Sequence, residues 1–381
     1  MMRLSNRKSW KVLLVSMAAA LSFSMLAGCS DNDKDNEAAA SSSPNSSAGA
    51  APSSSDAPDN SPVLVTYKGG KVTQNEFDTS IHVMKFLSPD QSQYLDMDVF
   101  RETLLKQLAA FEYLQGQAKD EAKKEAESQA DTQIKTYKSG MGESYESSLK
   151  EQNLTESQVR DYMVRVLTVY QDMRLKVTDD DVKKYFDEHK GDFTVASVRH
   201  VLVGFTDSNN KERTDADALK RAKEVKAKLD GGADFAAVAK EYSDDTGSKE
   251  TGGLYENKAL GTYVEEFKQA ALTLPLNTIS DPVKTTYGYH IMKVESRTEK
   301  TFDKLTDDEK KQIKSTLSSE KVQSFLEKDL DGIITKINLP KASASAATGA
   351  SAAPAASAPA AAPAGSAAPA SAAPAASPAA Q

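Results

Sequence analysis

The sequence of 381 residues contains a single cysteine, Cys29, and only four histidines. One cysteine cannot form a disulfide within the chain. The motifs GxxxxGK[ST], GxSxG and HExxH are absent, which removes the usual sequence signals of a P-loop, a hydrolase nucleophile and a zinc protease. Because His82 and His189 have no zinc-ligand spacing to any cysteine, histidine or paired carboxylate, we expect neither a metal nor another cofactor.

The chain also has fewer positively than negatively charged residues. The chain has 47 lysines and arginines against 55 aspartates and glutamates, a net charge of −8. Loss of residues 1–28 would remove four cations and no acid, so that 43 − 55 leaves −12; the four are Arg3, Arg7, Lys8 and Lys11. Since such a surface repels nucleic acid and phosphate, we expect no nucleic-acid partner.

A long apolar run occurs at residues 12–26, after a basic segment. The run is short for a membrane span, and its basic flank and small-residue end predict a secretory signal peptide over residues 1–28. It ends in Leu-Ala-Gly-Cys29, which resembles a bacterial lipobox. The resemblance implies cleavage before Cys29, acylation of its sulfur and anchoring at the extracytoplasmic face of the bacterial cell membrane. A plain signal peptide followed by an unrelated cysteine is the alternative.

Two segments have too few large apolar side chains to form a core. Residues 29–61 are rich in Ser, Ala, Asn, Asp and Pro, which predicts a disordered tether. Residues 341–381 are almost entirely Ala, Pro, Ser and Gly, and the frequent prolines block a continuous helix. We interpret this tail as a solvated spacer, with a segment that contacts the cell wall as the alternative.

The foldable sequence begins with a strand at 63–67, a turn, and a helix that starts at the capping box Thr73-x-x-Glu76. A long helix is expected after Thr306, with apolar side chains along one side as far as Ile337. This apolar side must pack on earlier helices, so residues 62–191 and 301–340 predict one helical domain around an inserted unit. The earlier helices are expected at 99–119, 120–138, 143–151, 156–176 (capping box Thr155-x-x-Gln158) and 178–191.

The inserted unit, residues 195–297, is bounded by two apolar runs that each carry one histidine. Strand alternation places His200 in the first run and His290 in the second on the core-facing side. Two inward histidines on distant strands predict a pair that meets within one small sheet. On the strand pattern alone, a structural pair in the core is the favoured alternative. Between the runs we expect helices at 214–229, 234–242 and 264–274, and a loop at 243–253.

Three stretches of this unit resemble parvulin-type peptidyl-prolyl isomerases: GGADFAAVAKEYSDDTGSK at 231–249, EFKQAALTL at 266–274 and ISDPVKTTYGYHIMKV at 279–294. With the lipobox in front and helices on either side, the order of parts is similar to extracytoplasmic foldase lipoproteins of the PrsA type, with a helical body similar to SurA chaperones. The resemblance implies an α+β fold. In that fold a parvulin domain, a four-stranded antiparallel sheet with surrounding helices, is inserted into a mainly α-helical chaperone domain.

The resemblance also implies a site for prolyl peptides on one face of the sheet. The implied reaction is cis/trans isomerisation of X–Pro bonds in unfolded or folding secreted polypeptides. Two alternatives remain: a holding chaperone whose parvulin domain is inactive, and a purely structural envelope lipoprotein. A homodimer through the helical domain is left open. Carried over residue by residue, the catalytic groups are His200, Asp245, Thr285 and His290, and the pocket aromatic is Phe267.

The chain departs from the parvulin pattern after Gly253. Where parvulins usually have Gly-Gly-Asp-Leu-Gly and an aromatic residue, this chain has Gly-Gly-Leu-Tyr255-Glu-Asn-Lys, and Tyr263 replaces a methionine that usually lines the pocket. Tyr255 would then act as a pocket wall; alternatively, the loop closes over an inactive site. Residues 204–207 lack the basic cluster of phosphate-selective relatives, so we expect no preference for phosphorylated serine or threonine.

Overall fold

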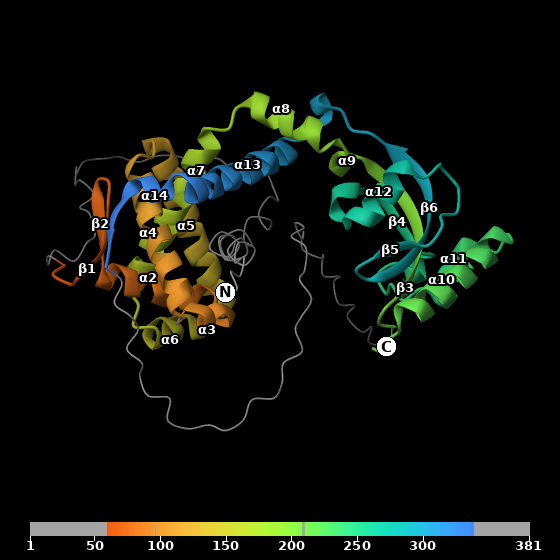
Figure 1. Cartoon of the computed structure of the whole chain (residues 1–381), viewed down its shortest axis with the longest axis horizontal. Coiled ribbons are helices and arrows are strands. Elements are labelled where there is room, and N and C mark those ends of the chain that lie inside the picture. The colour runs from red at the N-terminus through yellow and green to blue at the C-terminus, as the bar shows by residue number, and fades with distance from the viewer. Residues whose placement is uncertain (1–58, 96, 208–209, 339–381) are drawn as a thin grey trace, which may run out of the picture. The chain divides into compact units, whose positions relative to one another are not determined.

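The structure, a computed structural model, describes residues 59–95, 97–207 and 210–338, which fall into two units (Figure 1). Within these ranges the first unit comprises residues 59–178 and 314–338, and the second comprises residues 179–313. The predicted signal peptide, most of the predicted tether and the predicted tail lie outside the described residues. No helix within the described ranges has the length and apolar character needed to cross a bilayer.

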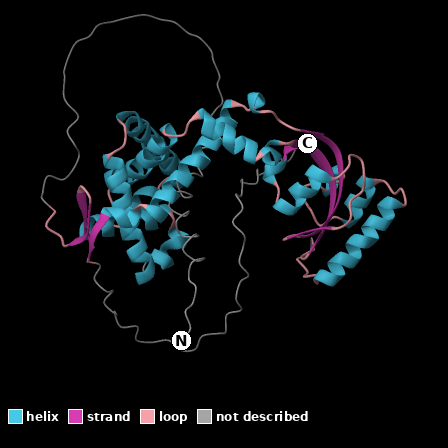
Figure 2. Ribbon diagram, turned by 45° about the horizontal axis from the view of Figure 1, so that its top comes forward, coloured by secondary structure: helices cyan, strands magenta, loops and turns pink. Residues whose placement is uncertain are grey.

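The first unit is mainly helical and includes a small three-stranded sheet (Figure 2). The predicted capping boxes at Thr73 and Thr155 are confirmed at the starts of α2 and α7. The helix α13 begins in the second unit and continues into the first. In chain order the elements are β1 (Val63–Tyr67), β2 (Gly70–Thr73), α2 (Gln74–Leu87), η1 (Pro89–Gln91), α3 (Ser92–Leu95), α4 (Asp98–Gly116), α5 (Asp120–Met141), α6 (Ser144–Glu151), α7 (Glu156–Leu175), α13 (Asp307–Lys328), α14 (Leu330–Ile333) and β7 (Ile334–Ile337).

The end of this unit differs from the single long helix expected through Ile337, and that prediction was wrong. Helix α13 ends at Lys328, and after the short α14 the chain enters strand β7. β7 pairs antiparallel with β1, which gives the strand order β2-β1-β7. Ile334 and Ile337 suit one face of a helix by spacing, but β-branched residues also favour strands. Here the pairing supplies hydrogen-bond partners for the edge of β1.

The core of the first unit depends on close approach of α5 and α7. Ala122, Ala126 and Ala130 recur every four residues on α5 and are buried. Small side chains at this spacing let the axis of α7 lie close to that of α5. The returning segment contributes Val322, which is buried in the same apolar cluster as residues of α4 and α7.

The carboxyl group of Glu112, on α4, is partly buried beside β1 and α7. The Tyr67 hydroxyl donates a hydrogen bond to it at 3.1 Å, and an Arg165 nitrogen lies 3.4 Å from its other oxygen. Burial and, to a smaller extent, the charge of Glu76 raise the pKa of Glu112 to about 7, against the opposing effects of the Arg165 charge and the Tyr67 hydrogen bond. The folded protein therefore favours the protonated form of Glu112 in the mildly acidic range.

We expect Glu112→Gln to remove a pH dependence from the stability of the first unit. A raised carboxyl pKa stabilises the fold below the unfolded value of about 4.5, and this contribution is lost as pH rises through 7. Between pH 5 and 8 the unfolding free energy of the wild type should therefore fall by roughly 2–3 kcal/mol relative to Glu112→Gln. Urea unfolding followed by far-ultraviolet circular dichroism measures this difference. A difference that does not vary with pH would contradict it.

The second unit contains a four-stranded antiparallel sheet in the order β4-β3-β6-β5. This confirms the predicted α+β class and the small antiparallel sheet. Strand β4 occupies the segment after Gly253, where sequence analysis located no strand. The elements are α8 (Asp179–Glu188), α9 (Lys190–Phe193), β3 (Val195–Gly204), α10 (Asp215–Asp230), α11 (Phe235–Tyr242), η2 (Lys249–Thr251), β4 (Leu254–Ala259), η3 (Leu260–Thr262), α12 (Glu265–Thr273), β5 (Val283–Thr285), β6 (Gly288–Thr298) and η4 (Phe302–Lys304).

Both faces of this sheet are covered. Helices α10 and α11 pack on one face, against Val201, Val203 and Ile291. Helix α12 packs on the other, against Val198 and Met292 (Figure 1). Because side chains alternate along a strand, the α12 face also receives the side chains at positions 200 and 290. Two polar residues are thereby placed inside an otherwise apolar layer.

Candidate active site

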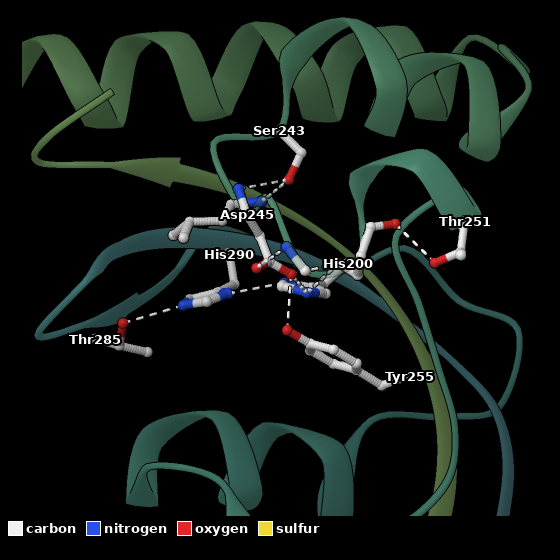
Figure 3. A network of polar contacts seen from close by, with 10 residues as sticks. His200, Ser243, Asp245, Thr251, Tyr255, Thr285 and His290 are labelled. Atoms are coloured by element: carbon white, nitrogen blue, oxygen red, sulfur yellow. Dashed lines mark hydrogen bonds and ion pairs between the residues drawn. The ribbon is translucent and has the colours of Figure 1, made fainter. Parts of the chain in front are cut away.

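Two buried histidines meet at the centre of the sheet (Figure 3). The antiparallel register of β3 and β6 sets His200 opposite Met292 and His290 opposite Leu202. The two imidazoles are therefore diagonal neighbours on one face. Their Nδ1 atoms lie 3.1 Å apart, and the rings are inclined by only 25°.

Each histidine has a second polar partner on the far side of its ring. Thr285 Oγ1 lies 3.1 Å from His290 Nε2, and Asp245 Oδ2 lies 3.0 Å from His200 Nε2. The structure thus joins the four residues predicted as catalytic in one row, Thr285–His290–His200–Asp245. They come from β5, β6, β3 and the loop after α11.

Both ring nitrogens of each imidazole have a polar partner. Because an ionised carboxylate only accepts, His200 Nε2 donates a hydrogen bond to Asp245. One proton lies between the two Nδ1 atoms, and the Thr285 hydroxyl is the partner of His290 Nε2. The row therefore leaves no ring nitrogen of the pair without a hydrogen bond.

Asp245 is ionised in spite of its burial. The Tyr255 hydroxyl donates to Oδ2 at 2.8 Å, the Ser248 hydroxyl donates to the same oxygen, and the N–H of Gly247 donates to Oδ1 at 3.1 Å. Burial opposes the charge, but the hydrogen bonds from His200, Ser248 and Tyr255 outweigh it and hold the pKa of Asp245 below its ordinary value.

His290 is neutral over the physiological range. Burial and, after it, the neighbouring His200 lower its pKa to about 3, while Asp245 acts in the opposite direction. The side chain is only 6% exposed. A protonated imidazole here would lose hydration without gaining an anionic partner of its own.

Aromatic rings surround the histidines on the α12 side. The Tyr255 ring stacks on His200 with a centroid distance of 4.9 Å, and Phe267 lies edge-to-face with His200 and His290 at 5.5 and 5.3 Å. Tyr263 lies 4.7 Å from Phe267 and 5.6 Å from Tyr255. The three residues predicted to bind substrate are therefore assembled beside the histidine pair. Burial raises the pKa of Tyr255 and of Tyr263, so both hydroxyls remain protonated.

The loop that carries Asp245 is fixed by backbone contacts with β3. The N–H of His200 donates to the carbonyl of Gly253 at 2.9 Å, and Arg199 Nη1 donates to the carbonyl of Gly252 at 3.0 Å. Gly253 has φ = +73°, and a Cβ on it would lie 2.2 Å from the His200 carbonyl oxygen. Only glycine permits this approach.

Asp244 has a structural place next to Asp245. Its Oδ2 accepts from the N–H of Gly204 at 2.9 Å and from Arg213 Nη1 at 2.7 Å. These bonds tie the loop to the end of β3. They also pair the charge of Arg213, a cation that follows β3 in the chain, with a buried carboxylate.

Two serines of the site were missed by sequence reasoning. Ser248 Oγ lies 3.1 Å from His200 Nε2, and Ser243 Oγ accepts from the N–H groups of Leu202 and Asp245, each at 3.2 Å. Both serines are 1% exposed. Because serine is common in loops, the composition of this loop does not indicate that either serine belongs to the site. The three-residue spacing from Asp245 to Ser248, typical of a local side-chain turn, was the available signal.

The other histidines lie apart from this row. His82 belongs to α2 in the first unit, whereas His189 stacks on Tyr185 with a centroid distance of 4.2 Å. Within the described ranges no three His, Cys, Asp or Glu side chains are grouped as metal ligands. The predicted lipidation site, Cys29, lies outside the described residues.

Comparison with known proteins assigns the family. Residues 182–298 match the family described as PPIC-type PPIase domain. "Foldase protein PrsA" of Caldanaerobacter subterraneus subsp. tengcongensis is 35% identical over 248 residues, which are 64% of this chain and 72% of the relative. The chain belongs to the PrsA foldase family. Its second unit is a parvulin-type peptidyl-prolyl isomerase domain, which confirms the predicted family and enzyme class.

Other PrsA proteins give a consistent result. "Foldase protein PrsA 3" of Bacillus cereus is 35% identical over 254 residues, which are 66% of this chain and 75% of the relative. A crystal structure of PrsA peptidylprolyl isomerase from Bacillus anthracis has 28% identity and a TM-score of 0.38, and covers 60% of this chain and 94% of that chain. The family assignment does not rest on the latter.

We expect Gly253→Ala to destabilise the fold by roughly 2 kcal/mol more than Gly232→Ala. Both glycines have positive φ, but a Cβ at Gly232 meets nothing within 4 Å, whereas at Gly253 it collides with the backbone of His200. Gly232→Ala therefore reports backbone strain alone and serves as the matched control. Urea unfolding of the two variants measures the difference. Equal losses would show that the close approach is not required.

Proposed function

We propose that the second unit catalyses cis/trans isomerisation of X–Pro bonds in unfolded or folding polypeptides, while the helical unit holds those chains. The observation that carries the proposal is the satisfied row Thr285–His290–His200–Asp245, buried beside three aromatic side chains. This arrangement is polar and rigid, and each of its ring nitrogens has a hydrogen-bond partner. It suits a reaction in which no covalent bond is broken.

The physical demand of the reaction is modest. The barrier to rotation of a peptide bond, about 18–20 kcal/mol, comes from amide resonance. A site lowers the barrier by binding the twisted amide more tightly than the planar one. Twisting removes conjugation, so the nitrogen becomes pyramidal and the carbonyl regains the polarity of a ketone. Fixed dipoles and a fixed charge in a site that excludes water stabilise that state without reorganising.

The side chains divide this task. Phe267 and Tyr255 form the apolar surface for the proline ring and exclude water from it, and Tyr263 lies beside both rings. Asp245 faces the peptide bond, and its charge is held in one orientation by hydrogen bonds from His200, Ser248 and Tyr255. His290 and Thr285 hold the ring of His200 from the other side. No nucleophile, metal or cofactor is required.

The charge around the site favours clients without phosphate before the proline. Arg213, a cation that follows β3, is engaged by Asp244 at 2.7 Å and lies 3.9 Å from Asp207. An anionic group on a client would have to compete with these carboxylates and with the nearby charge of Asp245. We therefore assign the site to unmodified X–Pro segments.

The remaining parts of the chain support a location at the extracytoplasmic face of the cell membrane. The signal peptide 1–28, acylated Cys29 and tether 29–61 would anchor the folded units and separate them from the lipid surface. Residues 62–191 and 301–340 would serve as the chaperone domain, in which two copies could pair, and residues 341–381 as a spacer.

A holding chaperone with an inactive isomerase domain is the second candidate. The observation that favours it is the cover over Phe267, which is only 2% exposed and has the Tyr263 ring against it. A proline ring cannot contact a side chain that remains fully covered. Measured turnover of an X–Pro peptide separates the two candidates, since holding an unfolded client needs no turnover.

We expect His290→Ala and His200→Ala each to lower kcat/KM on an X–Pro tetrapeptide by about tenfold or more, because each breaks a buried hydrogen bond in the row. Protease-coupled isomerisation by the full chain measures this effect. His82→Ala in the first unit is the matched control and should retain wild-type turnover. Unchanged turnover in both site variants would remove the histidines from the mechanism. If suppression of client aggregation persisted, a holding role alone would survive.

We expect Cys29→Ser to release the protein from the membrane fraction of the producing bacterium. Without the cysteine sulfur no acyl chain can be attached at this position. Fractionation and labelling with a radioactive fatty acid measure the change. A Cys29→Ser protein that stays in the membrane fraction would refute anchoring through this residue.

A further inference from the structure

Two tyrosines of the aromatic cluster are held in different ways. The hydroxyl of Tyr255 donates to Asp245 at 2.8 Å, and its ring stacks on His200 at 4.9 Å with 24° between the planes. Tyr255 is therefore fixed at both ends of its side chain. The hydroxyl of Tyr263 has no hydrogen-bond partner within the described ranges. Its recorded ring contacts are those with Phe267 and Tyr255.

The Tyr263 ring takes up contact area on Phe267. The two rings lie 4.7 Å apart with 30° between their planes, a distance at which their faces overlap. Phe267 is 2% exposed, although it lies within 5.5 Å of both histidines at the site. A proline ring that approaches the histidine pair and rests on Phe267 must take the place of Tyr263.

Displacement of Tyr263 breaks few interactions. The backbone of Tyr263 lies between η3 and α12, and its N–H donates to the carbonyl of Leu260 at 3.2 Å. This bond is unaffected by rotation of the side chain. Rotation of the Tyr263 side chain would break its ring contacts with Phe267 and Tyr255 but no hydrogen bond among the described residues. Tyr255, by contrast, cannot move without leaving the Asp245 carboxylate short of a donor.

We propose that Tyr263 occupies the place of the proline ring in the free protein and is displaced when substrate binds, whereas Tyr255 remains as the fixed wall. This inference rests on the proposed isomerase function and adds to it the residue that sets substrate affinity. A ligand that must displace a side chain binds more weakly by the equilibrium constant of the displacement. Tyr263 therefore raises KM and leaves kcat largely unchanged.

Kinetics of Tyr263→Ala in the full chain test the inference. We expect KM for an X–Pro tetrapeptide to fall about three- to tenfold, the factor that corresponds to one aromatic pair, with kcat within about twofold of wild type. Tyr255→Ala should behave in the opposite sense, with a lower kcat and no fall in KM. Tyr94→Ala in the first unit is the control and should change neither constant, because Tyr94 is 48% exposed and remote in sequence from the site. Should Tyr263→Ala fail to fold, Tyr263→Met replaces it.

Each outcome decides the inference separately from the proposed function. A higher KM in Tyr263→Ala would make Tyr263 a wall of the pocket and overturn the inference. Turnover that is absent in the wild type but present in Tyr263→Ala would uphold it. If neither protein turned the peptide over, the isomerase proposal would fail, and binding of the same tetrapeptide, followed through the NMR signals of His290, would decide. Tighter binding by Tyr263→Ala upholds the inference, and equal or weaker binding overturns it.

Discussion

The hydrogen bond between the Nδ1 atoms of His200 and His290 is the interaction on which the second unit depends. It exists because β3 and β6, far apart in the sequence, pair in one register over the seven positions from Val198 to Gly204. A slip of one residue would send one imidazole to the α10 and α11 face, where only apolar side chains receive it. The long apolar pairing of the two strands thus serves to place two nitrogen atoms.

Burial of this pair imposes demands on the segments around it. Polar atoms inside a sheet must find partners, and here a threonine comes from β5 while an aspartate and a serine come from the loop after α11. The aspartate in turn would be costly to bury as an anion, and the phenol of Tyr255 contributes to its stabilisation. The residue that departs from the usual parvulin pattern has therefore been absorbed into the polar network. It is both a ring against His200 and a donor to Asp245.

The sequence predicted features that local patterns control. Capping boxes located α2 and α7, strand alternation put both histidines on the same face, and spaced motifs gave the family. It failed where a pattern has two physical solutions. The isoleucines of β7 suit a helix or a strand equally, and only the unpaired edge of β1 decides between them. β4 has exposed charges and Asn257 at positive φ, so it carries no strand signal of its own. Likewise, the burial of Ser248 depends on a loop fold that composition does not encode.

The pairing of β7 with β1 has a consequence for how the protein is made. Thr335 donates to the Thr66 carbonyl across 269 positions of sequence, and Asn338 closes on Leu64 at 2.7 Å. During synthesis, β1 emerges early and must wait with one side open until nearly all of the described chain has been released. Residues 179–313, which are continuous, are complete before then. The edge of β1 that pairs with β7 therefore stays available for incorrect strand pairing until β7 has been synthesised.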